Sequence, residues 1–214
     1  MIQKQLLTAW LALFVGIAVL IIPDRMPAQD KAFSGPYAGG EVGRQNIIGG
    51  SLIDNIDFLS HDTRRVFALQ AGARYQFDFG LVVGIEGSVG RMDGKLALSD
   101  PAKQLDITYD NDRQTTVGLI SGFALGPQKR WLLFGYLSEA TRKFDVMIKR
   151  EGTRFEQRDE QGFLRFGIGV EKQFLNRLNL RISAGSGRAA FGDRQTNMKV
   201  TRKVEFGVAA LIQL

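Results

Sequence analysis

Residue types that could perform catalysis are sparse along this chain. His61 is its only histidine and stands between Ser60 and Asp62. A serine hydrolase needs its serine and histidine side chains in contact, whereas neighbours in an extended chain point to opposite sides. The triplet therefore indicates an exposed histidine, and we expect a protein that is not an enzyme.

Two further motifs match chemical patterns only in part. Residues Gly185 to Ala190 fit the dinucleotide pattern G-x-G-x-x-A, but a helix and a parallel strand would have to follow, and the continuation FGDRQTN is turn-like. Asp110-Asn111-Asp112 resembles the start of a calcium loop, but the next residues, RQTT, lack its glycine and its distal glutamate. The absence of cysteine excludes thiolate metal sites. We expect no cofactor and no metal.

Charges that alternate with apolar residues are the more informative pattern. In LRFGIGVE, residues 164–171, large apolar side chains alternate with Arg165, glycine and Glu171. In LNLRISAG, residues 178–185, the same alternation places Arg181 among polar and small residues. A period of two is that of a β-strand. The stretch predicts two strands with a tight turn near residue 176, one face apolar and the other holding glycine and charge.

Such strands are typical of a small transmembrane barrel, whose apolar side chains face lipid. An eight-stranded barrel has an interior that side chains just fill, and an unpaired charge there is costly. We therefore expect a connected network of salt bridges in the lumen, formed by Glu41, Arg74, Glu86, Arg165, Glu171, Arg181 and Glu205. Structural filling is the favoured interpretation, and a gated or proton-conducting lumen is the alternative.

Composition agrees with one exported domain. The chain has 214 residues, 25 glycines and 44% hydrophobic residues, and after residue 22 it has no apolar run of the roughly 18 residues that a spanning helix needs. Residues 1–28 resemble a signal peptide, with Lys4 before an apolar run from Leu6 to Ile22; an uncleaved anchor is the alternative. The net charge of +6 lacks the basic-aromatic runs of nucleic-acid binders.

The mature chain, residues 29–214, predicts eight antiparallel strands in one up-and-down barrel. Short connections fall near residues 78, 127 and 176, and four long polar segments lie between them, at 48–64, 91–112, 142–161 and 187–203. Short turns on one side and long loops on the other are expected of an outer-membrane barrel. The facing of the strand near Trp131 stays open, because residues 131–134 are apolar in succession. A soluble lipocalin-like barrel, with the arginines outside, is the alternative fold.

Aromatic residues gather near the predicted short turns. Such residues would form a girdle at the membrane interface, the set being Tyr75, Phe77, Phe79, Phe123, Trp131 and Phe174. Burial in a soluble core is the rival interpretation.

Three segments carry a family resemblance. They are FSGPYAGGEVG, from Phe33, VGLISGFALGPQKRWLLFGYL, from Val117, and the hairpin at 164–185. Together they resemble the OmpA-like outer-membrane β-barrel superfamily. The resemblance implies a surface antigen, adhesin or envelope-stabilising protein in the outer membrane of a Gram-negative bacterium. It also implies recognition of the last strand by the barrel-assembly machinery, although the terminal residue is Leu214 where the family usually has Phe or Trp.

Partners are expected at the membrane and at the loops. Basic residues around the fourth loop would lie near lipopolysaccharide phosphates, which arginine can bind through two hydrogen bonds; they are Arg188, Arg194, Lys199, Arg202 and Lys203. Solvated loop charges are the equally weighted alternative. We expect a monomer that binds outer-membrane lipid and no nucleic acid. The functional alternatives are, in order of preference, a small ion or solute channel and a lipid A-modifying enzyme.

Overall fold

The computed structural model describes residues 31–53, 56–188 and 204–214, with the backbone alone at 46–53, 56–62 and a few single positions. Residues 32–214 form one compact unit. The expected signal peptide, residues 1–28, lies outside the described residues. No helix in the described part of the chain is long and apolar enough to cross a membrane.

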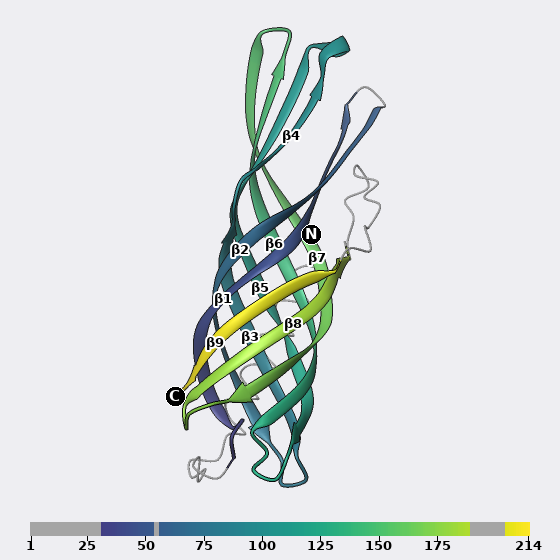
Figure 1. Ribbon diagram of the computed structural model, residues 1–214. Coiled ribbons are helices and arrows are strands. Elements are labelled where there is room, and N and C mark those ends of the chain that lie inside the picture. Colours follow the sequence, from purple (N-terminus) through teal and green to yellow (C-terminus); the bar gives the residue numbers. More distant parts are fainter. Residues whose placement is uncertain (1–30, 54–55, 189–203) are drawn as a thin grey trace, which may run out of the picture. The chain divides into compact units, whose positions relative to one another are not determined.

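Long antiparallel strands build almost the whole unit (Figure 1). In chain order they are β1 (Gly35–Ile53), β2 (Ile56–Gln76), β3 (Leu81–Met92), β4 (Lys95–Asp100), β5 (Leu105–Leu125), β6 (Trp131–Arg150), β7 (Thr153–Gln173), β8 (Leu178–Arg188) and β9 (Glu205–Gln213), with a short 3-10 turn, η1 (Pro101–Lys103), between β4 and β5.

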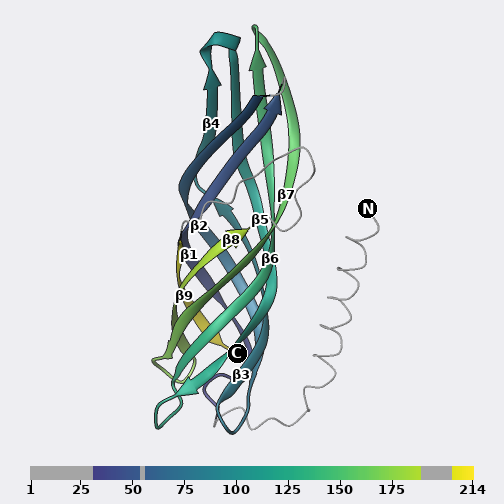
Figure 2. The same cartoon turned by 90° about the vertical axis from the view of Figure 1, so that its right-hand side faces the viewer.

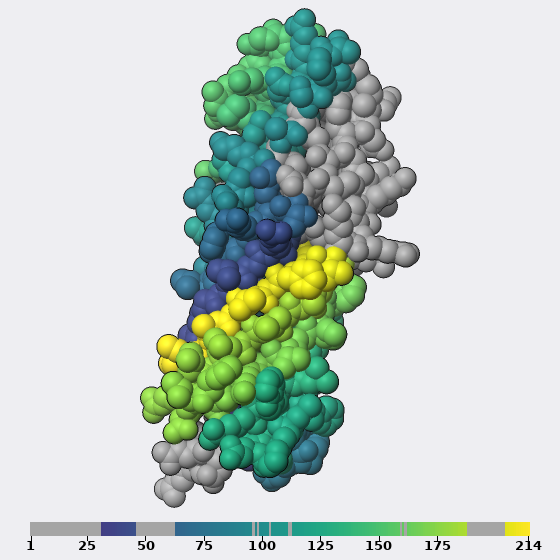
Figure 3. Space-filling view, viewed as in Figure 1, coloured from purple at the N-terminus to yellow at the C-terminus, as the bar shows by residue number. Residues whose placement is uncertain are grey.

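The sheet closes on itself into a barrel of eight strands. Its order is β3-β2-β1-β9-β8-β7-β6-β5-β4, and a β3–β5 pairing completes the ring. Both β3 and β4 pair with β5, at residues 114–123 and 105–110, so they are two halves of one barrel strand. The break between them falls at Gly94, which has a φ of +79°. Figure 3 shows β9 lying between β1 and β8. The predicted fold class is confirmed.

Side chains alternate as a membrane barrel requires. Leu69 is 70% exposed and Ile168 65% exposed, whereas Arg74 is 4% exposed and Glu171 is fully buried. Large apolar side chains therefore face outward and the charges face the lumen, which is the reverse of a lipocalin-like barrel. On β6, Trp131 and Leu133 face outward while Leu132 and Phe134 are buried, and this settles the facing that the apolar run left open.

Three tight turns connect neighbouring strands at one end of the barrel. At Gly80 and Gly126, φ is +100° and +86°, values that glycine adopts without strain. Aromatic side chains collect beside these turns: Phe77 contacts both Tyr75 and Phe79, with ring centroids 4.8 and 5.6 Å apart. Phe79, Phe123, Trp131 and Phe174 are about half exposed or more. This placement fits the expected girdle.

The opposite end extends far beyond the shortest strands (Figure 2). At three of the four segments predicted as long loops, the chain instead continues as paired strands. Pairing of β1 with β2 continues to Ile53↔Ile56, that of β5 with β4 and β6 runs through residues 105–110, and that of β6 with β7 reaches Arg150↔Thr153. The fourth segment, 187–203, begins within β8, and its residues 189–203 lie outside the described residues.

The physical reason for this error is that polar sequence was equated with irregular backbone. Antiparallel ribbons in water satisfy their backbone hydrogen bonds with each other and tolerate polar side chains on the exposed face. The β6–β7 ribbon ends in a two-residue turn, in which Glu151 and Gly152 have φ of +49° and +80°. Positive φ at both central residues matches the twist of a hairpin. We call the ribbons formed by β4 with residues 105–110 of β5, and by residues 142–150 of β6 with 153–161 of β7, the outer extension.

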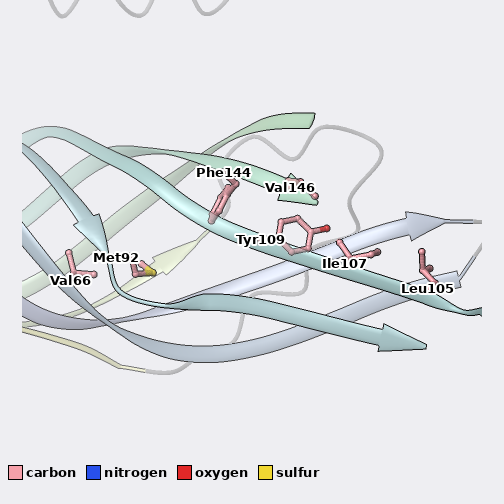
Figure 4. Packing of buried hydrophobic residues seen from close by; sticks show 7 residues of the cluster. All are labelled: Val66, Met92, Leu105, Ile107, Tyr109, Phe144 and Val146. Carbon is pink, nitrogen blue, oxygen red and sulfur yellow. The ribbon is translucent and has the colours of Figure 1, made fainter. Parts of the chain in front are cut away.

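Apolar residues line the inner face of the outer extension and pack on the top of β2 and β3 (Figure 4). The cluster comprises Val66, Met92, Leu105, Ile107, Tyr109, Phe144 and Val146, all 8% exposed or less. The rings of Tyr109 and Phe144 meet edge to face, with centroids 6.2 Å apart. The outward neighbours, such as Asp106 and Asp145, are exposed. The extension is therefore a small water-facing sheet with its own core.

Candidate functional site: the filled lumen

The centre of the lumen holds a carboxylate between two guanidiniums. Arg74, on β2, reaches across the barrel to Glu171, on β7, and donates two hydrogen bonds to it, of 2.9 and 2.7 Å. Arg181, the cross-strand neighbour of Glu171 on β8, donates a third through Nε at 3.0 Å. All three side chains are nearly or fully buried. Because burial removes both water and counterions, each of these charges depends on the others.

The network continues toward β3 and β1. Arg181 also binds Glu86, and the Tyr37 hydroxyl donates a 2.7 Å hydrogen bond to the same carboxylate. The Arg74 guanidinium stacks over the Tyr37 ring at 4.4 Å from its centroid. Planar guanidinium groups favour such stacking, because the face of an aromatic ring attracts a cation. One connected cluster thus ties together β1, β2, β3, β7 and β8.

A second ion pair lies apart from this cluster. Arg165 on β7 binds Glu205 on β9, with Nε 3.2 Å from the carboxylate. Glu41 forms no salt bridge with any described residue and instead lines a cavity of about 50 Å³ together with Glu86, Arg165, Arg181, Tyr136 and Ser183. This volume holds about four water molecules. This cavity therefore has room for a few waters beside the charges.

Glycines on β7 and β8 make room for two aromatic side chains of β6. A Cβ atom added at Gly167 would lie 2.6 Å from the Tyr136 hydroxyl, and one at Gly169 would lie within 2.8 Å of the Phe134 ring. Gly169 and Gly167 are the cross-strand partners of Phe134 and Tyr136, so these rings can lie over β7 only because the facing residues have no side chain. The alternation of glycine and charge in residues 164–171 is thus explained by space as well as by polarity.

Below the charges, at the short-turn end, the lumen is apolar. Phe33, Val82 and Leu132 are fully buried there and pack with Ile120, Ala124 and Phe134. Hydrogen bonds from the Phe33 amide to Gln76 and from the Gln76 amide to Ser34 hold the first residues inside. We call this set the apolar plug. Sequence reasoning missed it, because Phe33 precedes β1 and the facing of residues 131–134 was open.

Above the charges, sequence reasoning missed a buried arginine. Arg142 is 3% exposed, donates hydrogen bonds of 2.8 and 2.9 Å to Gln114 and Gln45, and stacks 4.2 Å from the centroid of Phe163. Burial lowers the pKa of Arg142, and the Glu205 carboxylate opposes that shift. The residue fell in a segment predicted as loop. Counting β6 alternation upward from Leu132 would have placed it inside.

The structure describes the side chains of only one of the two sets of expected site residues. All seven charges expected in the lumen point inward: Glu41, Arg74, Glu86, Arg165, Glu171, Arg181 and Glu205. Arg188 ends β8 with only its backbone described, and Arg194, Lys199, Arg202 and Lys203 lie outside the described residues. No group of three or more potential metal-ligating side chains occurs among the described residues.

Comparison with solved structures finds matches over most of the chain. Ail, the attachment invasion locus protein of Yersinia pestis, is 17% identical with a TM-score of 0.43, over 83% of this chain and 95% of Ail. Neisserial surface protein A is 12% identical with a TM-score of 0.47, over 85% and 98%. The N-terminal barrel of Pseudomonas aeruginosa OprF is 11% identical with a TM-score of 0.39, over 84% and 97%.

Comparison by sequence gives the family. No curated protein matches this chain. Residues 12–210 match the family described as outer membrane protein beta-barrel domain. That match covers most of the barrel unit, from ahead of β1 to within β9. The chain therefore belongs to the outer membrane protein beta-barrel domain family.

Proposed function

We propose that this protein is a closed, non-conducting outer-membrane barrel that stabilises the envelope and presents a contact surface outside the cell. The observation that carries the proposal is the filling of the lumen along its length. Charged side chains occupy the middle, and the apolar plug closes the short-turn end. An ion crossing this path would have to displace paired charges and enter an apolar layer, and both steps are costly.

The outer extension is the part suited to contacts. Its outward face carries charges of both signs, with salt bridges such as Lys95–Asp110 at 3.0 Å and Arg158–Asp145 at 3.2 Å. Exposed pairs of this kind add little stability, so these side chains remain available to other molecules. The apolar cluster beneath them keeps the ribbons together and gives the surface a fixed shape.

Export and location complete the proposal. Residues 1–28 would be removed as a signal peptide, and the chain would insert as a monomer into the outer membrane of a Gram-negative bacterium. Recognition by the assembly machinery would use β9, the strand that pairs with β1 to close the barrel. N-terminal sequencing of protein taken from the outer membrane tests the processing: we expect the mature chain to begin at Gln29.

Planar-bilayer recording tests the non-conducting lumen. The refolded full-length mature barrel is checked for folding by heat-modifiable migration on a gel and is inserted by fusing vesicles that contain it with the bilayer. We expect no steady current beyond that of the bare membrane. Steady, ohmic currents that scale with the amount inserted would overturn the proposal and identify a small ion or solute channel.

Absence of catalysis is a separate part of the proposal. A lipid A-modifying enzyme would change the mass of lipid A in cells that express the barrel. We expect identical lipid A mass spectra with and without expression, and the gain or loss of an acyl chain would contradict the proposal.

A further inference from the structure

Five cations line the outer edge of the lipid-facing surface on consecutive barrel strands. Each follows a large apolar side chain on the outward face: directly after Val42, Phe67 and Val89 on β1, β2 and β3, one threonine after Val117 on β5, and after Leu137, Glu139 and Thr141 on β6. All five side chains are exposed. We call this set the basic collar: Arg44, Arg65, Arg91, Arg113 and Lys143.

Cross-strand pairing brings like charges side by side in the collar. Arg44 is opposite Arg65 in the β1–β2 register, and Arg113 is opposite Lys143 in the β5–β6 register. Arg91 and Arg113 are the next residues after the Gly90↔Gln114 pair. Directly opposite residues lie about 5 Å apart, and like charges at that distance destabilise a sheet. A run of such pairs costs stability unless anions lie between them.

Anions from the chain itself do not fill that role among the described residues. Lys143 pairs with Glu160 only at 3.9 Å, with both side chains at least half exposed. No carboxylate of a described residue forms a salt bridge with Arg44, Arg65, Arg91 or Arg113. Asp93 lies beside Arg65, since its amide donates to the Arg65 carbonyl, but it forms no salt bridge there. The collar therefore has unneutralised positive charge.

The neighbours of the collar place it at the hydrocarbon boundary. Arg44 is opposite Phe206 and Arg91 is opposite Phe67, and these two aromatic side chains are 59% and 54% exposed. On β2, β3 and β6 the residue two positions further from the short-turn end is polar and exposed: Thr63, Asp93 and Asp145. Arginines beside lipid-facing aromatics, at the end that carries the outer extension, meet the headgroups of the outer leaflet.

We propose that the basic collar binds the phosphates of lipid A, the phosphorylated glycolipid of the outer leaflet. This inference rests on the proposed function, since it requires the outer extension to point out of the cell. Each phosphate carries several acceptor oxygens and can bridge two guanidiniums through charge-assisted hydrogen bonds. Such a phosphate would supply the anion that the like-charged pairs lack. The site covers β1, β2, β3, β5 and β6, and it is separate from the fourth-loop cations.

Titration with lipid A tests the collar. The refolded mature barrel in neutral detergent micelles is titrated with fluorescent lipid A carrying two phosphates, then with the same lipid dephosphorylated and with phosphatidylglycerol. The test variant is Arg65→Gln/Arg91→Gln/Arg113→Gln. The matched control, Lys129→Gln/Lys172→Gln/Arg177→Gln, removes the same charge at the short-turn end.

We expect the dissociation constant for bisphosphorylated lipid A to rise about fivefold for each arginine removed, hence about a hundredfold in the test variant, and to change less than about twofold in the control. Equal loss in both variants, wild-type binding that survives dephosphorylation, or equally tight binding of phosphatidylglycerol would each overturn the proposal. The dephosphorylation arm uses the wild-type chain and so stands if the variant fails to fold. Conductance is recorded separately, so a conducting barrel would contradict the proposed function without deciding the collar.

Discussion

The spanning part of the barrel and the outer extension use the same backbone with opposite polarity. In the spanning part, Ile168 is 65% exposed and Glu171 is fully buried. In the extension, Ile107 is 1% exposed while its neighbours Asp106 and Thr108 face outward. The reversal falls on β5 between Ile107 and Val117, and on β6 between Leu137 and Phe144. On β6 the inward positions continue without a break from Leu132 to Val146, so the surrounding solvent decides which face is apolar. On β5 a register shift between Asn111 and Arg113 moves the inward positions from odd to even residues, and the reversal coincides with it.

The largest effect should come from the centre of the lumen. Glu171→Ala leaves the guanidiniums of Arg74 and Arg181 buried without their shared carboxylate, and breaking a buried ion pair from one side costs about 3 to 5 kcal/mol. Urea unfolding in phosphatidylcholine vesicles measures the loss. A loss below about 1 kcal/mol would mean that bulk water solvates these arginines in place of the carboxylate.

Phe144→Ala tests the core of the outer extension. The buried ring packs against Tyr109, and truncating a core phenylalanine costs about 3 kcal/mol or more. Because the extension has its own core, hydrogen exchange should accelerate at residues 105–110 and 144–148 and stay slow in the spanning strands. Equal acceleration in both parts would show that they unfold as one unit.

Ile168→Arg tests the lipid-facing surface of the spanning part. An outward cation near the middle of the bilayer costs about 2 kcal/mol or more, so the free energy of unfolding in vesicles should fall by that amount. The matched change in the extension, Thr108→Arg, places the cation in water and should change stability by less than about 0.5 kcal/mol. Similar costs for the two variants would remove the distinction between lipid and water.

The smallest effect is expected for an exposed ion pair. Arg158→Gln removes the 3.2 Å contact with Asp145, in which the two side chains are 89% and 58% exposed. Surface pairs of this kind contribute about 0 to 1 kcal/mol, so the urea midpoint should hardly move. A shift as large as that of Glu171→Ala would show that the charges of the extension are structural.

Sequence alone predicted the fold well because period-two alternation is a local signal. Each of Arg74, Arg165 and Arg181 lies between two apolar neighbours, so its inward direction follows from the strand period. Which carboxylate each guanidinium binds depends on barrel closure, and that brings β2 and β7 to opposite sides of one lumen. The period-two pattern alone does not show which strands face each other across the lumen.

The remaining errors have the same physical origin. Residues 142–161 were predicted as loop because their outward side chains are polar, although Phe144 and Val146 alternate with Lys143 and Asp145. That alternation is the strand signal with its apolar face turned inward. Arg142 was missed with this segment, and most of the apolar cluster was missed with it and with residues 91–112. Testing both polarities of the period-two pattern would have found them.

Spin labelling tests the reversal of polarity most directly. The chain has no cysteine, so single labels can be placed by Ile168→Cys and Thr108→Cys without removing others. Oxygen, which concentrates in lipid, and a water-soluble nickel chelate then compete to relax each label in vesicles. We predict that the label at 168 responds to oxygen and the label at 108 responds to nickel. A label at 168 that responds to nickel, or that neither reagent reaches, would contradict the account.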